Sequence, residues 1–446
     1  MLTNGGKLME RRKSLFLLYF FGGVLFMLMT SKDAEAIPAF ARKYEAPCTL
    51  CHSTWPRLND FGFKYLLNGY QMPDSEDGAE EGKIKVAEDL TLDSPASFPP
   101  ISIRLEGSSY LSRTTNTYIP PSTVAGSGED EQSGGLFSGG EMAGNILGGG
   151  TLAKNVSYWF DIPQGSSPDN VTKRITQAMF LGFHNIGGAG MVNIKFGSLL
   201  NSDLDAVHKT RRVISGKDAT PMPMGWRNGN GTGRAGSNDL GVSIYGRPNL
   251  GQIIYDLIIS QGNNGETDDD NDGNLAYAGM LRGDIKSVSA SVRYFVNSQG
   301  FGGKAGKQIY NNDVNEWVFG LRYASTLFDV DFLYDIANQS DVSSNGIGTK
   351  RESGGFMLEG LFRISKSFEF GALYEILSEK DGGSESYNDG ALSIEGAWYI
   401  TQNARMTLKY LVDVQDEKYR AQYTDSTGAS KGIDASKVII GFDVVL

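Results

Sequence analysis

The chain has 446 residues, a formal net charge of −11, and 40% hydrophobic and 11% aromatic residues. This apolar content excludes an intrinsically disordered protein, and the acidic balance argues against nucleic-acid binding, which requires a basic face. Two cysteines and three histidines exclude a disulfide framework and a histidine-rich metal centre.

The first 36 residues have the three parts of a secretory signal peptide. Residues 9–13, Met-Glu-Arg-Arg-Lys, form a basic region, residues 14–29 are apolar or small, and Ala34-Glu35-Ala36 is a small-residue cleavage site. The apolar run is short for a membrane-spanning helix, so we expect export, cleavage before Ile37 and a mature net charge of −13, from 36 basic and 49 acidic residues. A retained membrane anchor is the alternative.

Both cysteines lie in Cys48-Thr49-Leu50-Cys51-His52, the C-x-x-C-H attachment signature of a c-type haem. Two thiols at this spacing can add to the vinyl groups of one haem, and the adjacent histidine supplies an imidazole to the iron. The alternatives are a disulfide, which would not need His52, and half of a zinc site, whose other ligands are not nearby. We therefore predict one covalent haem c held by Cys48, Cys51 and His52.

The residues after this motif predict a short helix. Pro56 can occupy a helix start, and Asn68-Gly69 predicts the end. Three residues spaced i, i+3 and i+7 give the helix an apolar face for a porphyrin: Leu58, Phe61 and Tyr65.

Met72 is the nearest candidate for the second axial haem ligand, and a methionine opposite histidine raises the haem potential. His184, His208 and an open position are the alternatives. Residues 37–98 are too short and polar to fold alone, so we expect the haem and walls supplied from elsewhere to complete this segment.

From Ile101 onward the hydrophobic pattern has period two, which predicts β-strands. In residues 328–336, apolar and aromatic residues at even positions alternate with Asp329, Asp331, Leu333 and Asp335. The segments run to about ten residues, the length that crosses a bilayer when tilted. No later run reaches the ~18 apolar residues that indicate a spanning helix.

Sixteen such segments alternate between short turns and long loops, which is the pattern of an outer-membrane β-barrel with both ends on the periplasmic side. We predict an all-β fold with a small α-helical haem-c plug: signal peptide 1–36, plug 37–98 and transmembrane barrel 99–446. A soluble β-sandwich or propeller is the alternative. The segments are 101–112, 141–153, 156–164, 175–184, 190–199, 239–247, 251–261, 274–282, 288–297, 315–324, 328–338, 354–364, 368–377, 390–400, 404–414 and 435–446.

A barrel of this size encloses a lumen wide enough for water, and we expect the plug to enter it from the periplasmic end. The long loop 200–238 corresponds to the loop that folds into the lumen in sixteen-stranded porins and could pack on the plug; a solvated outer loop is the alternative. Charged residues on the polar face of the strands are expected to point inward: Arg104, Glu106, Asp256, Arg293, Arg322, Asp329, Asp331, Asp335, Glu369, Glu375, Lys409 and Asp413.

Residues 37–43, the motif at 48–52, and then Pro56, Leu58 and Phe61-Gly62 resemble the N-terminus of the fused monohaem cytochrome–porins. These are outer-membrane electron-transfer proteins that include the Fe(II) oxidases of iron-oxidising bacteria. The resemblance implies a signal peptide, one haem plug and a sixteen-stranded porin, with Cys48 and Cys51 as haem anchors and His52 as proximal ligand.

The resemblance implies a protein of the Gram-negative outer membrane with Fe(II):cytochrome c oxidoreductase-like activity. Electrons would pass from extracellular Fe(II) through the haem to a periplasmic c-type cytochrome. The partners expected are membrane lipid, these two redox partners and further copies of the chain, with no nucleic acid. Two alternatives stay open: an outward conduit to external acceptors, and a diffusion porin whose haem is structural or regulatory.

Overall fold

The computed structural model describes residues 40, 46–71, 83–87, 90–93, 101–119, 128–133, 139–153, 155–164, 178–188, 190–200, 203–207, 238–261, 275–301, 310–339, 351–381, 387–415 and 430–446. The predicted signal peptide, Met72 and His208 lie outside the described residues. In this part of the chain, no helix is both long and apolar enough to cross a membrane.

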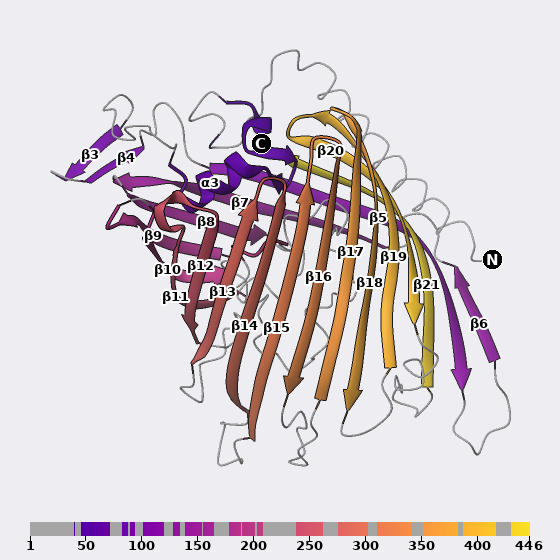
Figure 1. Ribbon diagram of the computed structural model, residues 1–446. Helices are drawn as coiled ribbons and strands as arrows, with labels where there is room; N and C mark the ends of the chain where they lie inside the picture. The colour runs from indigo at the N-terminus through magenta and orange to yellow at the C-terminus, as the bar shows by residue number, and fades with distance from the viewer. Residues whose placement is uncertain are drawn as a thin grey trace, which may run out of the picture. The chain divides into compact units, whose positions relative to one another are not determined.

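Within the described residues, sixteen antiparallel strands close into a β-barrel (Figure 1), as predicted. The closed sheet runs from β5 to β21, seventeen strands, but β6 (Gly128–Ser133) only extends the outer part of β5, which pairs directly with β7. Pairing of β21 with β5 closes the circle. The sixteen are β5 (Ile101–Ile119), β7 (Gly139–Ala153), β8 (Val156–Gln164), β9 (Ala178–Ile186), β10 (Val192–Leu200), β11 (Asn238–Gly246), β12 (Ile253–Ser260), β13 (Ala276–Ile285), β14 (Val288–Phe301), β15 (Tyr310–Ala324), β16 (Phe328–Gln339), β17 (Arg351–Ser365), β18 (Phe368–Asp381), β19 (Tyr387–Thr401), β20 (Ala404–Gln415) and β21 (Ser430–Val445).

Short turns join the strands at one end of the barrel. Residues 286–287, 366–367 and 402–403 are two-residue turns, and the strand connections at the other end are longer. Asn155 and Lys286 adopt φ of 62° and 53° in such turns, the left-handed conformation that tight hairpins require. Because outer-membrane barrels place short turns in the periplasm, this end is the periplasmic end, and both ends of the barrel domain lie there.

Side chains alternate between an apolar outer face and the lumen. On β12, Ile253 and Leu257 are 57% and 54% exposed, whereas Ile254 and Ile258 are 0% and 3% exposed. The same exposed apolar face recurs around the barrel, far beyond the apolar patches of water-soluble monomers. The barrel is therefore a transmembrane barrel of the outer-membrane type, and this face contacts lipid.

Several strands extend further toward the outer end than predicted. The first was expected to end at residue 112 but continues to Ile119, and part of the expected loop 113–140 forms β6 against it. These additions consist mainly of polar and charged residues, so they lack the apolar alternation from which the strands were predicted. Leu446, where an aromatic residue is more usual, still pairs with Ile103 through two backbone hydrogen bonds of 2.9 and 2.7 Å.

In residues 46–71, the 3-10 turn η1 (Cys48–Leu50) and two short paired strands, β1 (His52–Thr54) and β2 (Arg57–Leu58), precede the short helix α3 (Asp60–Leu67). The expected helix start at Pro56 is wrong: Asn59 caps α3 by accepting from the Gly62 backbone N–H, because an amide side chain can satisfy a helix N-terminus and proline cannot. The predicted end at Asn68-Gly69 is confirmed, with Gly69 at φ 68°.

The later part of the predicted plug, residues 37–98, contains a hairpin that the sequence analysis did not predict. Its strands are β3 (Lys83–Ala87) and β4 (Leu90–Asp93), and they pair with each other but not with the barrel. The predicted plug therefore contains a β-hairpin in addition to its helix.

Candidate functional site

The candidate haem turn, residues 48–52, lies at the periplasmic end of the barrel (Figure 1 shows the neighbouring α3 at this end). The Cys48 backbone N–H donates to Gln402 Oε1, in the turn between β19 and β20, at 3.1 Å. Neither Cys48 nor Cys51 forms a disulfide, and both are half-buried. Burial raises the pKa of both thiols, and together with the nearby Cys48 it raises that of Cys51 to about 11.

Asn59 joins the haem turn to α3. Its backbone N–H donates to the Cys51 carbonyl at 2.9 Å, and its side-chain amide donates to the carbonyls of Leu50 and Thr49 at 3.0 and 3.2 Å. Gly62, on the first turn of α3, allows the helix to approach: a β-carbon there would lie 2.1 Å from the Cys51 oxygen. The helix and the turn thus form one packed unit.

His52 has a hydrogen bond that fixes its proton. Its Nδ1 lies 3.3 Å from the Pro56 carbonyl oxygen, and because a carbonyl only accepts, Nδ1 carries the proton of the neutral ring. Nε2 then keeps the lone pair that a metal requires. A backbone carbonyl on the other ring nitrogen is the usual partner of a metal-ligating histidine.

Trp55 connects the segment after His52 to three barrel strands. Its indole Nε1–H donates to Asp443 on β21 at 3.0 Å. Its carbonyl accepts from the Tyr399 hydroxyl on β19 at 3.1 Å and from Arg405 on β20 at 3.3 Å. The Trp55 ring also lies beside the His52 ring, with 5.0 Å between centroids.

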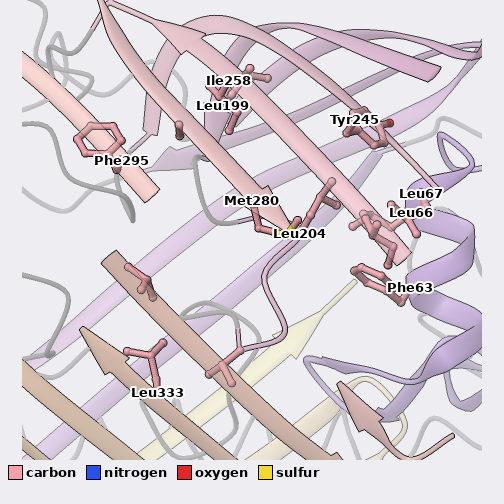
Figure 2. Close-up of a cluster of buried hydrophobic side chains, with 14 of the residues drawn as sticks. Phe63, Leu66, Leu67, Leu199, Leu204, Tyr245, Ile258, Met280, Phe295 and Leu333 are labelled. Atoms are coloured by element: carbon pink, nitrogen blue, oxygen red, sulfur yellow. The ribbon is translucent and has the colours of Figure 1, made fainter. Parts of the chain in front are cut away.

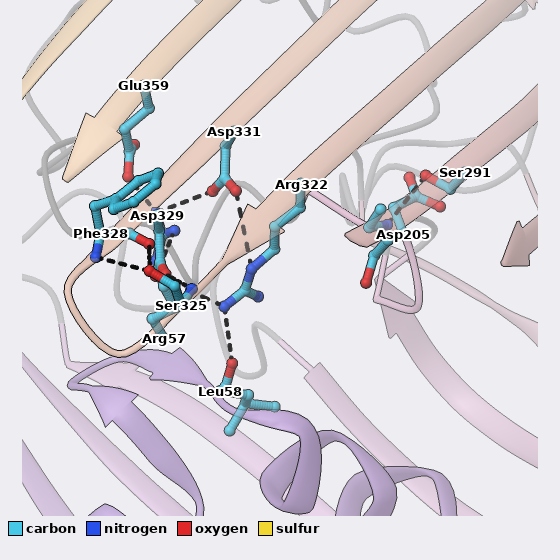
Figure 3. Close-up of polar contacts among 12 residues, drawn as sticks. Arg57, Leu58, Asp205, Ser291, Arg322, Ser325, Phe328, Asp329, Asp331 and Glu359 are labelled. Carbon is cyan, nitrogen blue, oxygen red and sulfur yellow. Dashed lines mark hydrogen bonds and ion pairs between the residues drawn. The ribbon is translucent and has the colours of Figure 1, made fainter. Parts of the chain in front are cut away.

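Arg57 is buried in a cluster of barrel carboxylates (Figure 3). It is 1% exposed, lies 3.0 Å from Asp329 and 2.9 Å from Asp331, and pairs closely with Glu359. Burial opposes its charge, but the three carboxylates outweigh burial and raise the pKa of Arg57 above its usual value. Asp331 and Glu359 are cross-strand partners, so Arg57 neutralises like charges that would repel.

Other arginines complete this contact. Arg322 of β15 donates to the Leu58 carbonyl at 3.0 Å (Figure 3), and Arg363 of β17 pairs with Asp329 and Glu369. Strands β15 to β21 therefore hold residues 55–58 through ionic and polar contacts.

The opposite side of the plug makes apolar contacts. Phe63, Leu66 and Leu67 of α3 are at most 6% exposed and belong to one cluster with Tyr245 and Leu204 (Figure 2). This cluster continues along the inner faces of β9 to β18. The sequence analysis expected charged inward side chains and missed these apolar ones, because they occupy positions in the polar register of their strands.

A stack of aromatic rings packs the plug against β8. Phe40 stacks on Tyr70 with centroids 5.0 Å apart, and Tyr70 stacks on Trp159 at 5.4 Å. Together with the Arg57 cluster, these contacts hold the plug on both sides of the lumen.

His184, an alternative candidate for the second axial ligand, lies at the interface between the barrel and the plug. It is 3% exposed, its Nε2 lies 2.6 Å from Ser157 Oγ, and its Nδ1 lies 3.1 Å from the Tyr245 hydroxyl. A β-carbon on Gly69 of the plug would lie 2.2 Å from the His184 ring. The ring supports the plug, and both its nitrogens have protein partners.

The described part of loop 200–238, residues 203–207, lies inside the barrel, the first of the two alternatives for this loop. Asp205 pairs with Arg293 at 2.8 Å, and the Ala206 backbone N–H donates to Ser291 at 3.0 Å. Both partners are on β14, so this segment narrows the lumen beside α3.

The expected inward charges are confirmed for eleven of the twelve residues: each is buried or half-buried on the lumen side, and the side chain of Asp413 lies outside the described part. Of the barrel-strand side chains that the structure describes, ten carboxylates and five cations are buried. Asp335, Glu316 and Glu375 lie deeper in the barrel than the Arg57 cluster. Among the described residues, no group of three or more His, Cys, Asp or Glu is arranged to hold a metal ion.

Sequence reasoning missed the residues that fix the haem turn: Trp55, Arg57, Asn59, Tyr399 and Gln402. The sequence held one signal for Arg57. An arginine that is buried needs an acidic partner, and Asp329 and Asp331 lie at the start of one strand. Most contacts of Trp55 and Asn59 involve backbone atoms, and the side-chain contact of Trp55 is with Asp443, far away in the sequence, so neither residue has a sequence signal.

No family model and no curated protein matches the chain. Solved structures of similar fold include the anion-selective porin of Comamonas acidovorans, with a TM-score of 0.50 and 14% identity over 78% of this chain and 100% of that one. The outer-membrane protein OmpT of Vibrio cholerae gives 0.47 and 11% identity over 77% and 98%. The first likeness shows the fold alone: a porin-like outer-membrane β-barrel.

Proposed function

We propose that this chain is a fused monohaem c-type cytochrome–porin that transfers electrons between an extracellular donor, Fe(II), and a periplasmic c-type cytochrome. The observation that carries the proposal is the His52–Pro56 hydrogen bond, the backbone-carbonyl contact typical of a metal-ligating histidine, within a C-x-x-C-H motif. The position of that motif at the periplasmic end of the barrel suits delivery to a periplasmic partner.

The residues present fit a covalent haem c. Cys48 and Cys51 lie on one 3-10 turn as thiols without a disulfide, and His52 follows them in the tautomer that ligation requires. When bound, the haem would supply a one-electron carrier, and the protein would supply its position, its insulation and its ligands. Met72 stays a candidate for the second axial ligand.

The lumen favours a small cationic donor. The haem turn is at the periplasmic end, so a donor from outside has to come down the barrel. Asp335, Glu316 and Glu375 line the deeper wall, and an excess of buried carboxylates attracts cations. We therefore favour dissolved Fe(II) over a docked external protein, and we keep a homo-oligomer as a prediction.

The proposal is tested by adding Fe(II) anaerobically to the purified, oxidised protein and recording the haem spectrum. Stoichiometric reduction is expected, and the Cys48→Ser/Cys51→Ser variant, which lacks thioether bonds, is the matched control. A haem that dithionite reduces but Fe(II) does not would overturn the iron assignment and favour the outward conduit. Absence of a covalent haem mass would overturn the electron-transfer proposal altogether.

A second candidate function is diffusion through the barrel, favoured by the porin-like fold. The plug contacts both sides of the lumen and an apolar cluster fills part of it, so the proposed cytochrome–porin should conduct little. A high, steady single-channel conductance of the haem-loaded protein in planar bilayers would support the diffusion porin instead.

A further inference from the structure

Residues 55–58, which lie shortly after the candidate haem ligand His52, all make contacts that help to fix the His52 imidazole. Pro56 accepts the His52 Nδ1–H, and its neighbours Trp55, Arg57 and Leu58 are all held by barrel side chains. The backbone carbonyl that orients the imidazole is therefore placed by the barrel wall and not by the plug alone.

The barrel contacts come from several strands. Tyr399 and Arg405 donate to the Trp55 carbonyl, directly before Pro56. Asp329 and Glu359 pair with Arg57, directly after it. Because both neighbours of Pro56 are fixed, the Pro56 oxygen has little freedom to move relative to the ring.

A hydrogen bond to the distant nitrogen of a ligating histidine raises the basicity of the nitrogen that binds the metal. A more basic imidazole favours the oxidised metal, so it lowers the reduction potential. The strength of this bond depends on the position of the Pro56 oxygen, and so on the barrel contacts of Trp55 and Arg57.

We propose that the lumen wall acts as a positioning shell for the haem ligand: Tyr399, Arg405 and the Arg57 carboxylate cluster set the His52–Pro56 hydrogen bond and through it the haem potential. This inference rests on the proposed function, since it requires the covalent haem. It makes Tyr399 and Glu359 positioning residues, because neither contacts His52 in the described contacts.

The test uses substitutions that keep the net charge constant, because a changed charge near a haem would shift its potential directly. Arg57→Gln/Glu359→Gln removes one cation and one carboxylate, and Asp329 and Asp331 keep Arg322 and Arg363 nearby. Tyr399→Phe removes only the hydroxyl that donates to Trp55. The matched control, Arg293→Gln/Asp256→Asn, breaks another fully buried pair away from residues 55–58.

Redox titration and electron paramagnetic resonance of the oxidised, haem-loaded full chain provide the readouts. We expect a higher midpoint potential of the haem and broader electron paramagnetic resonance signals in Tyr399→Phe and in the Arg57/Glu359 variant. The control should keep the potential and the signals of the parent protein. Unchanged values in Tyr399→Phe and the Arg57/Glu359 variant, or equal shifts in the control, would overturn the inference.

Covalent haem is checked by mass spectrometry in every sample. If the unsubstituted protein carries no haem, the proposed function itself has failed. Tyr399→Phe, which is nearly isosteric, keeps the test decisive if the double variant does not fold.

Discussion

Gly62 lies against the backbone of Cys51, so close that a β-carbon at residue 62 would be 2.1 Å from the Cys51 carbonyl oxygen. This contact places the first turn of α3 on the second cysteine of the candidate haem turn. A side chain at residue 62 has to move one of two backbone segments, since the clash is not with a flexible side chain.

Gly62→Ala should therefore separate α3 from the haem turn. Overpacking typically costs about 1–3 kcal/mol, and here it falls on the plug and not on the barrel. We expect less covalent haem per protein by absorbance, with the heat-modifiable barrel band on gels unchanged. Lys64→Ala, at an exposed position of the same helix, is the control. Full haem loading of Gly62→Ala would show that the contact between α3 and the candidate haem turn is not required for haem attachment.

His184→Phe tests whether this histidine binds the iron. Both of its nitrogens have protein partners, Ser157 and Tyr245, so the haem spectrum should not change. Loss of a buried hydrogen-bonded group should lower plug stability by about 1–3 kcal/mol, seen as faster proteolysis of the plug. A change from low-spin to high-spin absorption would instead identify His184 as an axial ligand.

Arg57→Ala should loosen the plug. Removal of one partner from a buried ion cluster costs about 3–5 kcal/mol, because Asp331 and Glu359 are left opposite each other without their shared cation. We expect more frequent opening in single-channel recordings and faster protease cleavage after the haem turn. Arg293→Ala breaks the ion pair of residues 203–207 and should not release the plug. Parent-like closure of Arg57→Ala would contradict the ionic anchoring.

A charged residue on the lipid-facing surface should destabilise the barrel by an amount that depends on its depth in the bilayer. Leu358 and Ile364 both point outward from β17 and are 46% and 60% exposed, but Ile364 is next to the 366–367 turn. Leu358→Arg should lower folding stability in vesicles by about 2–4 kcal/mol and Ile364→Arg by about 0–1 kcal/mol. Urea titration of the refolded barrel measures both. Equal costs at the two positions would mean that the bilayer midplane does not lie near Leu358.

The sequence predicted the barrel well because period-two alternation and turn chemistry are local signals. Residues such as Asp329 and Asp331 were placed in the lumen by that alternation alone. The limits of the strands were less predictable at the outer end, where residues after 112 lie on hairpins whose polar sequence does not alternate.

The site was predictable only in part. Cys48, Cys51 and His52 form a motif that the sequence displays, and whether they carry haem stays a prediction. The contacts of Arg57 with Asp329, 272 residues away, and of Trp55 with Asp443, 388 residues away, depend on barrel closure and have no local signal. Apolar inward residues such as Phe295 were missed because the lumen was expected to be polar throughout.

The hydrogen bond between Trp55 and Asp443 has a consequence for biogenesis. Asp443 belongs to β21, the last strand, whose pairing with β5 closes the barrel. The plug therefore reaches its final position only when the last strand is in place, with the turn of residues 48–52 already between the walls. Attachment of the proposed haem to Cys48 and Cys51 would need access to both thiols, so the proposed function predicts that cofactor loading in the periplasm precedes insertion of the chain into the outer membrane.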